Sequence, residues 1–219
     1  MAYYALGDSI SIDDYAGGPG LGAASLLADD LGIDLTMLAR DGATSDDVVR
    51  YQLDKVEGRP ALITLTMGGN DLLTTLFAPA KVGLPPDLDA AHRTVAQVAT
   101  NYAIALPALT ATGARVVLST VYDPTDGTGD LSWVGLPAWE GGLEVLAALN
   151  AMIRDAAARH GAAVADLHAA FLGHGAEAGD VTGAEPRPDN RDLWLCGHIE
   201  PNAWGAGAVR DTWRAALRG

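Results

Sequence analysis

The chain has 219 residues, 49% of them apolar, and a single cysteine, Cys196. This composition excludes a disordered chain and an intrachain disulfide, and the length fits one domain spanning residues 1–219. Twenty-eight acidic residues against fourteen basic ones give a net charge of −14, which argues against binding to nucleic acid or to anionic membrane surfaces.

Short apolar runs alternate with longer amphipathic stretches along the chain. Most of the apolar runs lack polar alternation, which is typical of strands covered on both faces. The predicted strands, in chain order, are Ala2–Leu6, Ile33–Leu38, Ala61–Met67, Arg115–Val121 and Ala163–Asp166. The predicted helices are Gly22–Leu31, Ser45–Val56, Asp87–Thr112, Trp139–His160 and Ala203–Leu217. We expect Ser45 to cap the second of these helices and Pro107 to interrupt the third.

This alternation predicts an α/β fold in which helices cover both faces of a parallel sheet. The expected architecture is a three-layer α/β/α sandwich with a flavodoxin-like, doubly wound sheet of five strands in the order 2-1-3-4-5. The irregular stretches 124–137 and 173–201 are rich in Gly, Pro and Asp, and both follow predicted strands. We therefore expect them over the carboxyl edge of the sheet, where open α/β folds place their sites.

No apolar run approaches the ~20 residues that span a bilayer. The first residues read as a strand, without the basic and apolar regions of a signal peptide. We expect a cytoplasmic protein with no membrane insertion, although a trimmed form of an exported protein would share these features.

Polar motifs follow the first and third predicted strands. The first strand leads into Gly7–Ser9 and the third into Gly68–Asp71, and each motif alone is ordinary turn chemistry. Because these two strands are neighbours at the topological switch point, Ser9 and Asn70 are expected to face each other across one crevice. An Asn amide there can stabilise the oxyanion formed when a serine attacks an ester, which is worth ~2.7–4 kcal/mol of barrier.

A third motif follows the second predicted strand. Gly42 allows its backbone N–H to approach a bound oxyanion closely, and it also precedes the helix predicted from Ser45. In order and spacing, Gly7–Ser9, Gly42–Ser45 and Gly68–Asp71 resemble the first three sequence blocks of the GDSL/SGNH hydrolases. The resemblance implies the SGNH hydrolase fold, Ser9 as the nucleophile, and an oxyanion hole formed by the backbone N–H groups of Ser9 and Gly42 and by Asn70.

The last family block normally reads Asp-x-x-His-Pro before the final helix, and it departs from that pattern here. When Pro201 and Asn202 are aligned with the Pro-Asn of the family, Glu200 occupies the histidine position and Gly197 the aspartate position. The nearest histidine, His198, stands two residues early. The resemblance therefore leaves the catalytic base open.

Three groups are candidates for that base, since a serine hydroxyl needs a proton acceptor within ~2.6–3.2 Å. His198 is favoured, oriented by Glu200 or Asp192. His174, in the Gly173–Gly175 turn, is the second candidate, and Glu200 itself is the third.

The expected function is hydrolysis of small-molecule carboxylic esters, with acyl or acetyl groups, through an acyl-enzyme. No histidine–carboxylate pattern has metal-ligand spacing, so we expect no metal and no cofactor. The alternative is an SGNH-like ligand-binding module, or a weakly active pseudoenzyme that lacks a properly placed base. A flavodoxin-like or response-regulator-like domain is disfavoured, because Asp8 and Asp71 are too few for the acidic cluster that Mg²⁺ requires.

Overall fold

The computed structural model describes residues 1–135, 138, 141–178, 192–197 and 199–219. Five parallel strands form the central sheet in the order β2-β1-β3-β4-β5, as predicted. Their bounds are β1 Ala2–Leu6, β2 Asp34–Met37, β3 Leu62–Leu65, β4 Arg115–Ser119 and β5 Ala163–Ala165. β1 lies at the centre of the switch point, where Ala5 pairs with Met37 on one side and with Thr64 on the other.

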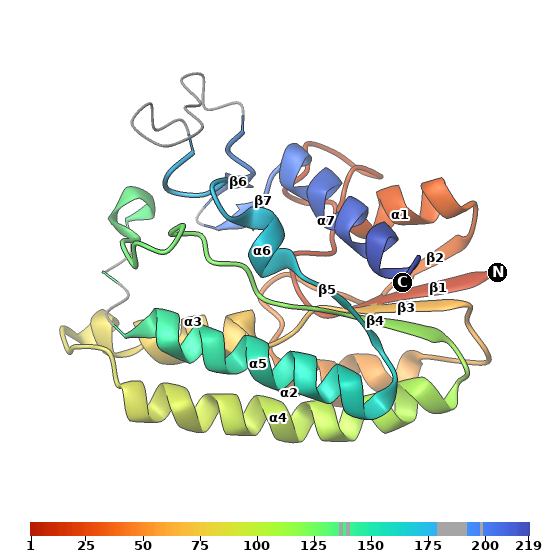
Figure 1. Cartoon of the computed structure of the whole chain (residues 1–219), viewed down its shortest axis with the longest axis horizontal. Coiled ribbons are helices and arrows are strands. Elements are labelled where there is room, and N and C mark those ends of the chain that lie inside the picture. Colours follow the sequence, from red (N-terminus) through yellow and green to blue (C-terminus); the bar gives the residue numbers. More distant parts are fainter. Residues whose placement is uncertain (136–137, 139–140, 179–191, 198) are drawn as a thin grey trace.

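Helices cover both faces of this sheet and complete an α/β/α sandwich (Figure 1). One face carries α1 (Ala23–Leu31), α6 (Leu167–Phe171) and α7 (Ala203–Ala216). The other carries α2 (Ser45–Asp47), α3 (Gly69–Phe77), α4 (Leu88–Ala111) and α5 (Gly142–His160). Each face has its own apolar core, one built against α4 and α5 and the other against α1 and α7.

Short elements fill the connections. A π-helix, η1 (Val48–Gln52), continues α2, and 3₁₀ turns are found at η2 (Leu53–Lys55), η3 (Pro79–Val82) and η4 (Ser132–Val134). Two short strands, β6 (Leu195–Cys196) and β7 (Glu200–Pro201), pair antiparallel just before α7. Within the part of the chain that the structure describes, no helix combines the length and apolarity needed to cross a membrane.

The predicted cap at Ser45 is wrong, because Thr44 caps α2. The Thr44 side chain accepts a hydrogen bond from the Asp47 backbone N–H, and the Asp47 carboxylate accepts one from the Thr44 N–H at 2.9 Å. This reciprocal capping box satisfies two backbone donors at once. It leaves the Ser45 hydroxyl free to bond elsewhere.

The predicted interruption at Pro107 is also wrong, because α4 runs through this residue. A proline inside a helix removes one backbone hydrogen bond. Here the neighbouring side chains Ala105, Leu106 and Leu109 are buried in the core, and their burial offsets the missing bond.

Candidate active site

The loop that carries Ser9 is fixed by contacts with two other segments. Gly7 has φ +119°, and a Cβ built there would lie 1.8 Å from the Thr66 carbonyl oxygen, so only glycine fits. The buried Gln52 side chain accepts from Gly7 N at 2.7 Å and donates to Gly7 O at 2.9 Å. The Asp8 N–H donates to Thr66 Oγ1 at 3.1 Å. These bonds hold the half-buried Ser9 just beyond the carboxyl end of β1.

Asn70 lies in the first turn of α3, in a segment that sequence motifs suggested was a turn. The helix begins after Gly68, which has φ +112° and so reverses the chain sharply after β3. The Asn70 side chain donates from Nδ2 to the carbonyl oxygen of Ala43 at 3.1 Å. An amide NH₂ has two hydrogens, so this bond leaves one for another acceptor.

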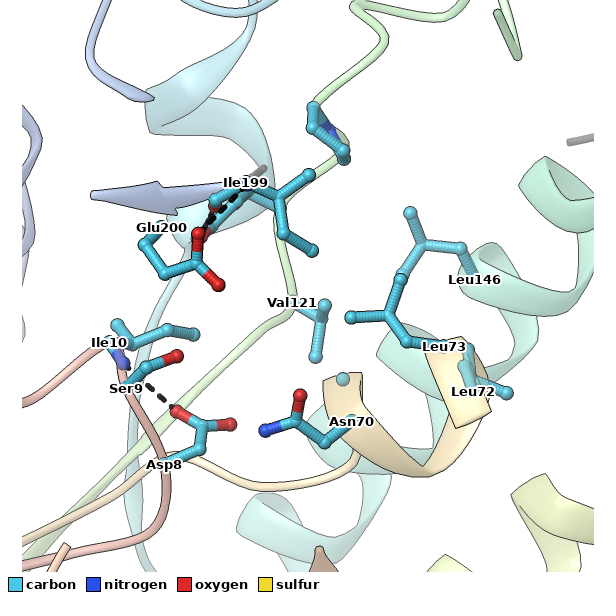
Figure 2. Close-up of a pocket in the computed structure, with 13 residues that line it drawn as sticks. Asp8, Ser9, Ile10, Asn70, Leu72, Leu73, Val121, Leu146, Ile199 and Glu200 are labelled. Atoms are coloured by element: carbon cyan, nitrogen blue, oxygen red, sulfur yellow. Dashed lines mark hydrogen bonds between the residues drawn. The ribbon is translucent and has the colours of Figure 1, made fainter. Parts of the chain in front are cut away.

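Ser9 and Asn70 line the same pocket, as their placement on neighbouring strands indicated (Figure 2). The pocket is narrow, with a cavity volume of about 40 Å³. Most of its wall is apolar, and no described lining residue is lysine or arginine. The described lining residues are Asp8, Ser9, Ile10, Gly69, Asn70, Leu72, Leu73, Val121, Tyr122, Pro124, Leu146, Ile199 and Glu200.

Glu200 reaches this pocket from the hairpin before α7. Its backbone pairs with Cys196 across β6 and β7, and its Oε2 accepts from Ile199 N at 3.1 Å. Asn202 anchors the hairpin: its side chain caps α7 and donates to Leu193 O at 2.7 Å. Figure 2 shows the Glu200 carboxylate on the Ser9 side of the pocket.

The structure places the other predicted site residues differently. The His174 ring stacks on Trp194 with centroids 3.4 Å apart, and its Nδ1 lies 2.7 Å from the Asp192 carbonyl oxygen. His174 is not among the described residues that line the pocket, and neither is the exposed Gly42. His198 lies outside the described residues.

Asp8 is a carboxyl group in the pocket wall that the sequence did not mark as part of the site. The residue is only 2% exposed, and this burial raises the pKa of Asp8 to about 7. Hydrogen bonds from the Thr66 hydroxyl and the Ile10 N–H lower the pKa, while the nearby charge of Asp71 raises it further. The available signal was its position, next to the serine at the end of a buried strand.

A doubly wound sandwich with a serine after β1 and an asparagine after β3, both lining one pocket, defines an SGNH-type hydrolase fold. The family model of the GDSL-like lipase/acylhydrolase family matches residues 5–207. The chain belongs to this family.

Solved structures with the same fold are similar over almost the whole chain. A phospholipase A1 from Streptomyces albidoflavus NA297 is 22% identical, with a TM-score of 0.62 and 98% of each chain covered. The acetyl xylan esterase AlAXEase is 20% identical, with a TM-score of 0.69, covering 99% of this chain and 100% of the esterase. An extracellular lipase from Streptomyces rimosus is 22% identical, with a TM-score of 0.61 and 99% of each chain covered. A search of curated protein sequences gave no significant match.

Proposed function

We propose that the protein hydrolyses carboxylic esters, with Ser9 as the nucleophile. The observation that carries the proposal is the shared pocket, in which the Ser9 hydroxyl and the Asn70 amide come from the ends of neighbouring strands. Membership of a lipase/acylhydrolase family supports it. The named activities of the structural relatives, on phospholipid and acetylated xylan, are both ester hydrolyses.

In the proposed reaction, Ser9 Oγ forms a bond to the acyl carbon and gives its proton to a base. The carbonyl oxygen becomes an oxyanion, to which Asn70 Nδ2 and the backbone N–H of Ser9, both in residues that line the pocket, would donate. The family resemblance adds the N–H of Gly42, which precedes Ala43 on the loop that Asn70 contacts. The ester C–O bond then breaks, and the departing alcohol takes the proton from the base. Water attacks the acyl-enzyme by the same route and returns the proton to Ser9.

We propose Glu200 as that base in preference to the two histidines. Glu200 occupies the family's histidine position, and its carboxylate is among the described groups that line the pocket. The His174 ring is stacked on Trp194 instead. The sequence favoured His198, and that alternative is tested directly by the variants below.

The pocket also favours a class of substrate. Its wall is formed mainly by aliphatic side chains, among them Leu73, Val121 and Leu146, which suit an apolar acyl group. Asp8 and Glu200 place two carboxyl groups in the same wall. We therefore propose an uncharged ester with an apolar acyl chain, since an anionic one would be repelled.

The test is steady-state hydrolysis of p-nitrophenyl esters of increasing chain length. Ser9→Ala should abolish turnover, and Ser132→Ala, which changes an exposed serine on η4, should not. Among Glu200→Gln, His198→Ala and His174→Ala, the glutamine variant should lose kcat most, by about 100-fold or more. Full activity of Ser9→Ala would refute the nucleophile, and a loss confined to one histidine variant would refute the base.

A ligand-binding protein that performs no chemistry is the second candidate. One observation favours it: Glu200 stands directly before Pro201 and Asn202, where the family normally has its histidine. A binding protein would hold the ester intact, so calorimetry would detect binding while product formation stayed at the rate of the uncatalysed reaction.

A further inference from the structure

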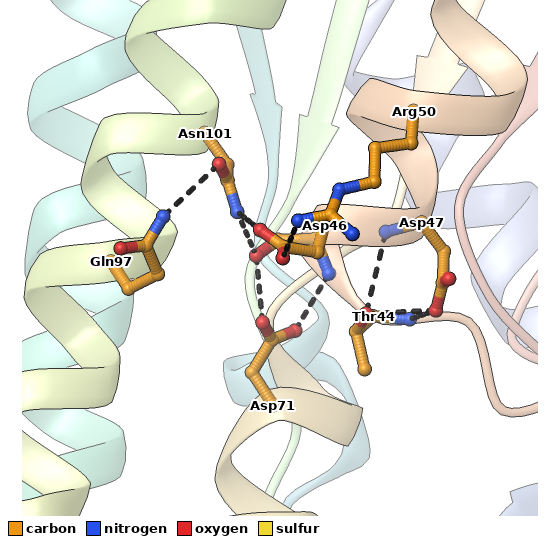
Figure 3. Close-up of polar contacts among 8 residues, drawn as sticks. Thr44, Asp46, Asp47, Arg50, Asp71, Gln97 and Asn101 are labelled. Carbon is orange, nitrogen blue, oxygen red and sulfur yellow. Dashed lines mark hydrogen bonds and ion pairs between the residues drawn. The ribbon is translucent and has the colours of Figure 1, made fainter.

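A buried polar network joins α3 to the loop that follows β2 (Figure 3). The Asp71 carboxylate accepts two hydrogen bonds from Ser45, from the backbone N–H at 2.8 Å and from the hydroxyl at 2.7 Å. The Ser45 hydroxyl in turn accepts from Asn101 Nδ2 on α4 at 2.8 Å. Asn101 also donates to Asp46 Oδ1 at 2.9 Å. One serine is thus held from two helices.

This network is costly to bury, which indicates that it does more than fill space. Ser45 is fully buried and Asn101 is 3% exposed. Burial raises the pKa of Asp71, because desolvation outweighs the two bonds from Ser45. Ser45 is not needed as a helix cap, since Thr44 already performs that task. Apolar side chains of the same size would join the helices at lower cost.

The position of the network shows what it fixes. Asp71 follows Asn70 directly, and Ser45 lies three residues after Gly42. The two elements touch twice, through Asn70 Nδ2 to Ala43 O and through Asp71 to Ser45. The separation between the two elements that carry the proposed oxyanion donors is therefore set by these bonds.

We infer that Asp71, acting through Ser45 and Asn101, is a positioning residue for the oxyanion hole. This inference rests on the proposed ester hydrolysis. Catalysis depends on donors placed for the transition state, and a displacement of about 1 Å can cost about 100-fold in rate. Asp71 touches neither substrate nor nucleophile in this role; it holds α3 and the Gly42 loop at a fixed distance.

The direct perturbation is Asp71→Asn, which keeps the size of the side chain. The Asn side chain has one oxygen and one NH₂ group in place of the two carboxylate oxygens. It can therefore accept only one of the two hydrogen bonds that Ser45 donates. We expect kcat to fall about 10- to 100-fold while KM changes less than about threefold, because a donor misplaced for the oxyanion acts on the transition state. Affinity for an alkyl boronic acid, which forms a tetrahedral adduct on a serine, should fall by the same factor as kcat/KM.

Ser45 supplies a milder variant and a rescue. Ser45→Ala keeps the backbone bond to Asp71 and removes the hydroxyl that links it to Asn101. It should show the same kcat loss on a smaller scale, and Ser45→Thr, which restores a hydroxyl, should recover part of it. Combining Ser45→Ala with Asp71→Asn should cost less than the sum of the two, because both break one network.

A matched control joins the same two helices elsewhere. Thr75 on α3 and Thr94 on α4 hydrogen bond through their hydroxyls at 2.9 Å, and neither lines the pocket. The Thr75→Val/Thr94→Val double variant should therefore keep wild-type kcat and boronate affinity, whatever its thermal stability.

The outcomes separate the two proposals. Absence of Ser9-dependent turnover and of boronate binding in the wild-type chain overturns the proposed function itself. An active wild-type chain with unchanged kcat in both Asp71→Asn and Ser45→Ala overturns the positioning role. Equal kcat losses in these variants and in the threonine control, in step with their melting temperatures, overturn it as well.

Discussion

Asp8 gives the chain a pH dependence of stability whose direction and size follow from its burial. The pKa of Asp8 is raised from 3.8 to about 7, chiefly because the folded protein removes the carboxylate from water. The folded chain therefore keeps this proton at pH values where the unfolded chain has lost it. Its stabilising contribution is complete below about pH 4 and is lost as the pH rises through about 7.

The perturbation is Asp8→Asn, which cannot ionise and whose side-chain oxygen can still accept from Ile10 N. Between the two pKa values each pH unit removes about 1.4 kcal/mol from the wild-type chain, so the loss between pH 5 and pH 8 is about 3 kcal/mol. The free energy of unfolding of the variant, minus that of the wild type, should therefore rise by about 3 kcal/mol from pH 5 to pH 8.

The assay is urea unfolding of both chains at pH 5 and at pH 8. Taking the difference between variant and wild type at each pH cancels the other titrating groups. Asp29→Asn, which changes an exposed carboxylate on α1, serves as the control and should give the same small difference at both pH values. If the difference for Asp8→Asn does not change with pH, the pKa of Asp8 is not raised by folding.

Two further substitutions test how the site is supported. Gly7→Ala should destabilise the chain by at least about 3 kcal/mol and reduce activity, because a Cβ there would lie 1.8 Å from the Thr66 carbonyl oxygen. Thermal melting followed by circular dichroism measures this loss, and a wild-type melting temperature would contradict it. Trp213→Ala should lower the free energy of unfolding by about 3–5 kcal/mol, because the ring is fully buried and also donates to Ser119 Oγ at 2.8 Å. Chemical unfolding measures this loss, and a loss below about 1 kcal/mol would be inconsistent with the packing.

The strands were predictable because their sequence pattern reflects burial on both faces. β1 has the predicted bounds, and the other strands begin or end within two residues of the predicted positions. The alternation of strands and helices predicted the parallel sheet, and the flavodoxin-like strand order placed Ser9 and Asn70 after neighbouring strands. That part of the site therefore follows from the fold class.

The helix that carries Asn70 was not predictable from local pattern. Gly68–Asp71 has the composition of a turn, and α3 depends on the positive φ of Gly68 and on Leu72 and Leu76, which are buried in the core. The cap of α2 depended likewise on which of two adjacent hydroxyls met Asp47. Tertiary contacts decided the first, whereas the second is a local contact between residues three apart in sequence.

The candidate base and the polar network depend on long-range geometry. Glu200 faces the pocket because of its register against Cys196 in a hairpin of two-residue strands, and a shift of one residue would turn it away. Asp71, Ser45 and Asn101 are separated by 26 and 56 residues in sequence. Ser45 and Asp71 lie in two of the sequence blocks that resemble the family, but no local pattern shows that their side chains bond to each other and to Asn101.

The proposed function requires that the pocket activate the Ser9 hydroxyl beside the Asn70 amide. Its most direct test is to treat the chain with a p-nitrophenyl alkylphosphonate, which forms a tetrahedral adduct on an activated serine, and to locate the label by peptide mass spectrometry. We expect one phosphonate on the peptide that contains Ser9, with labelling slowed in Asn70→Ala. An unlabelled Ser9, or a label that forms equally fast without the Asn70 amide, would contradict it.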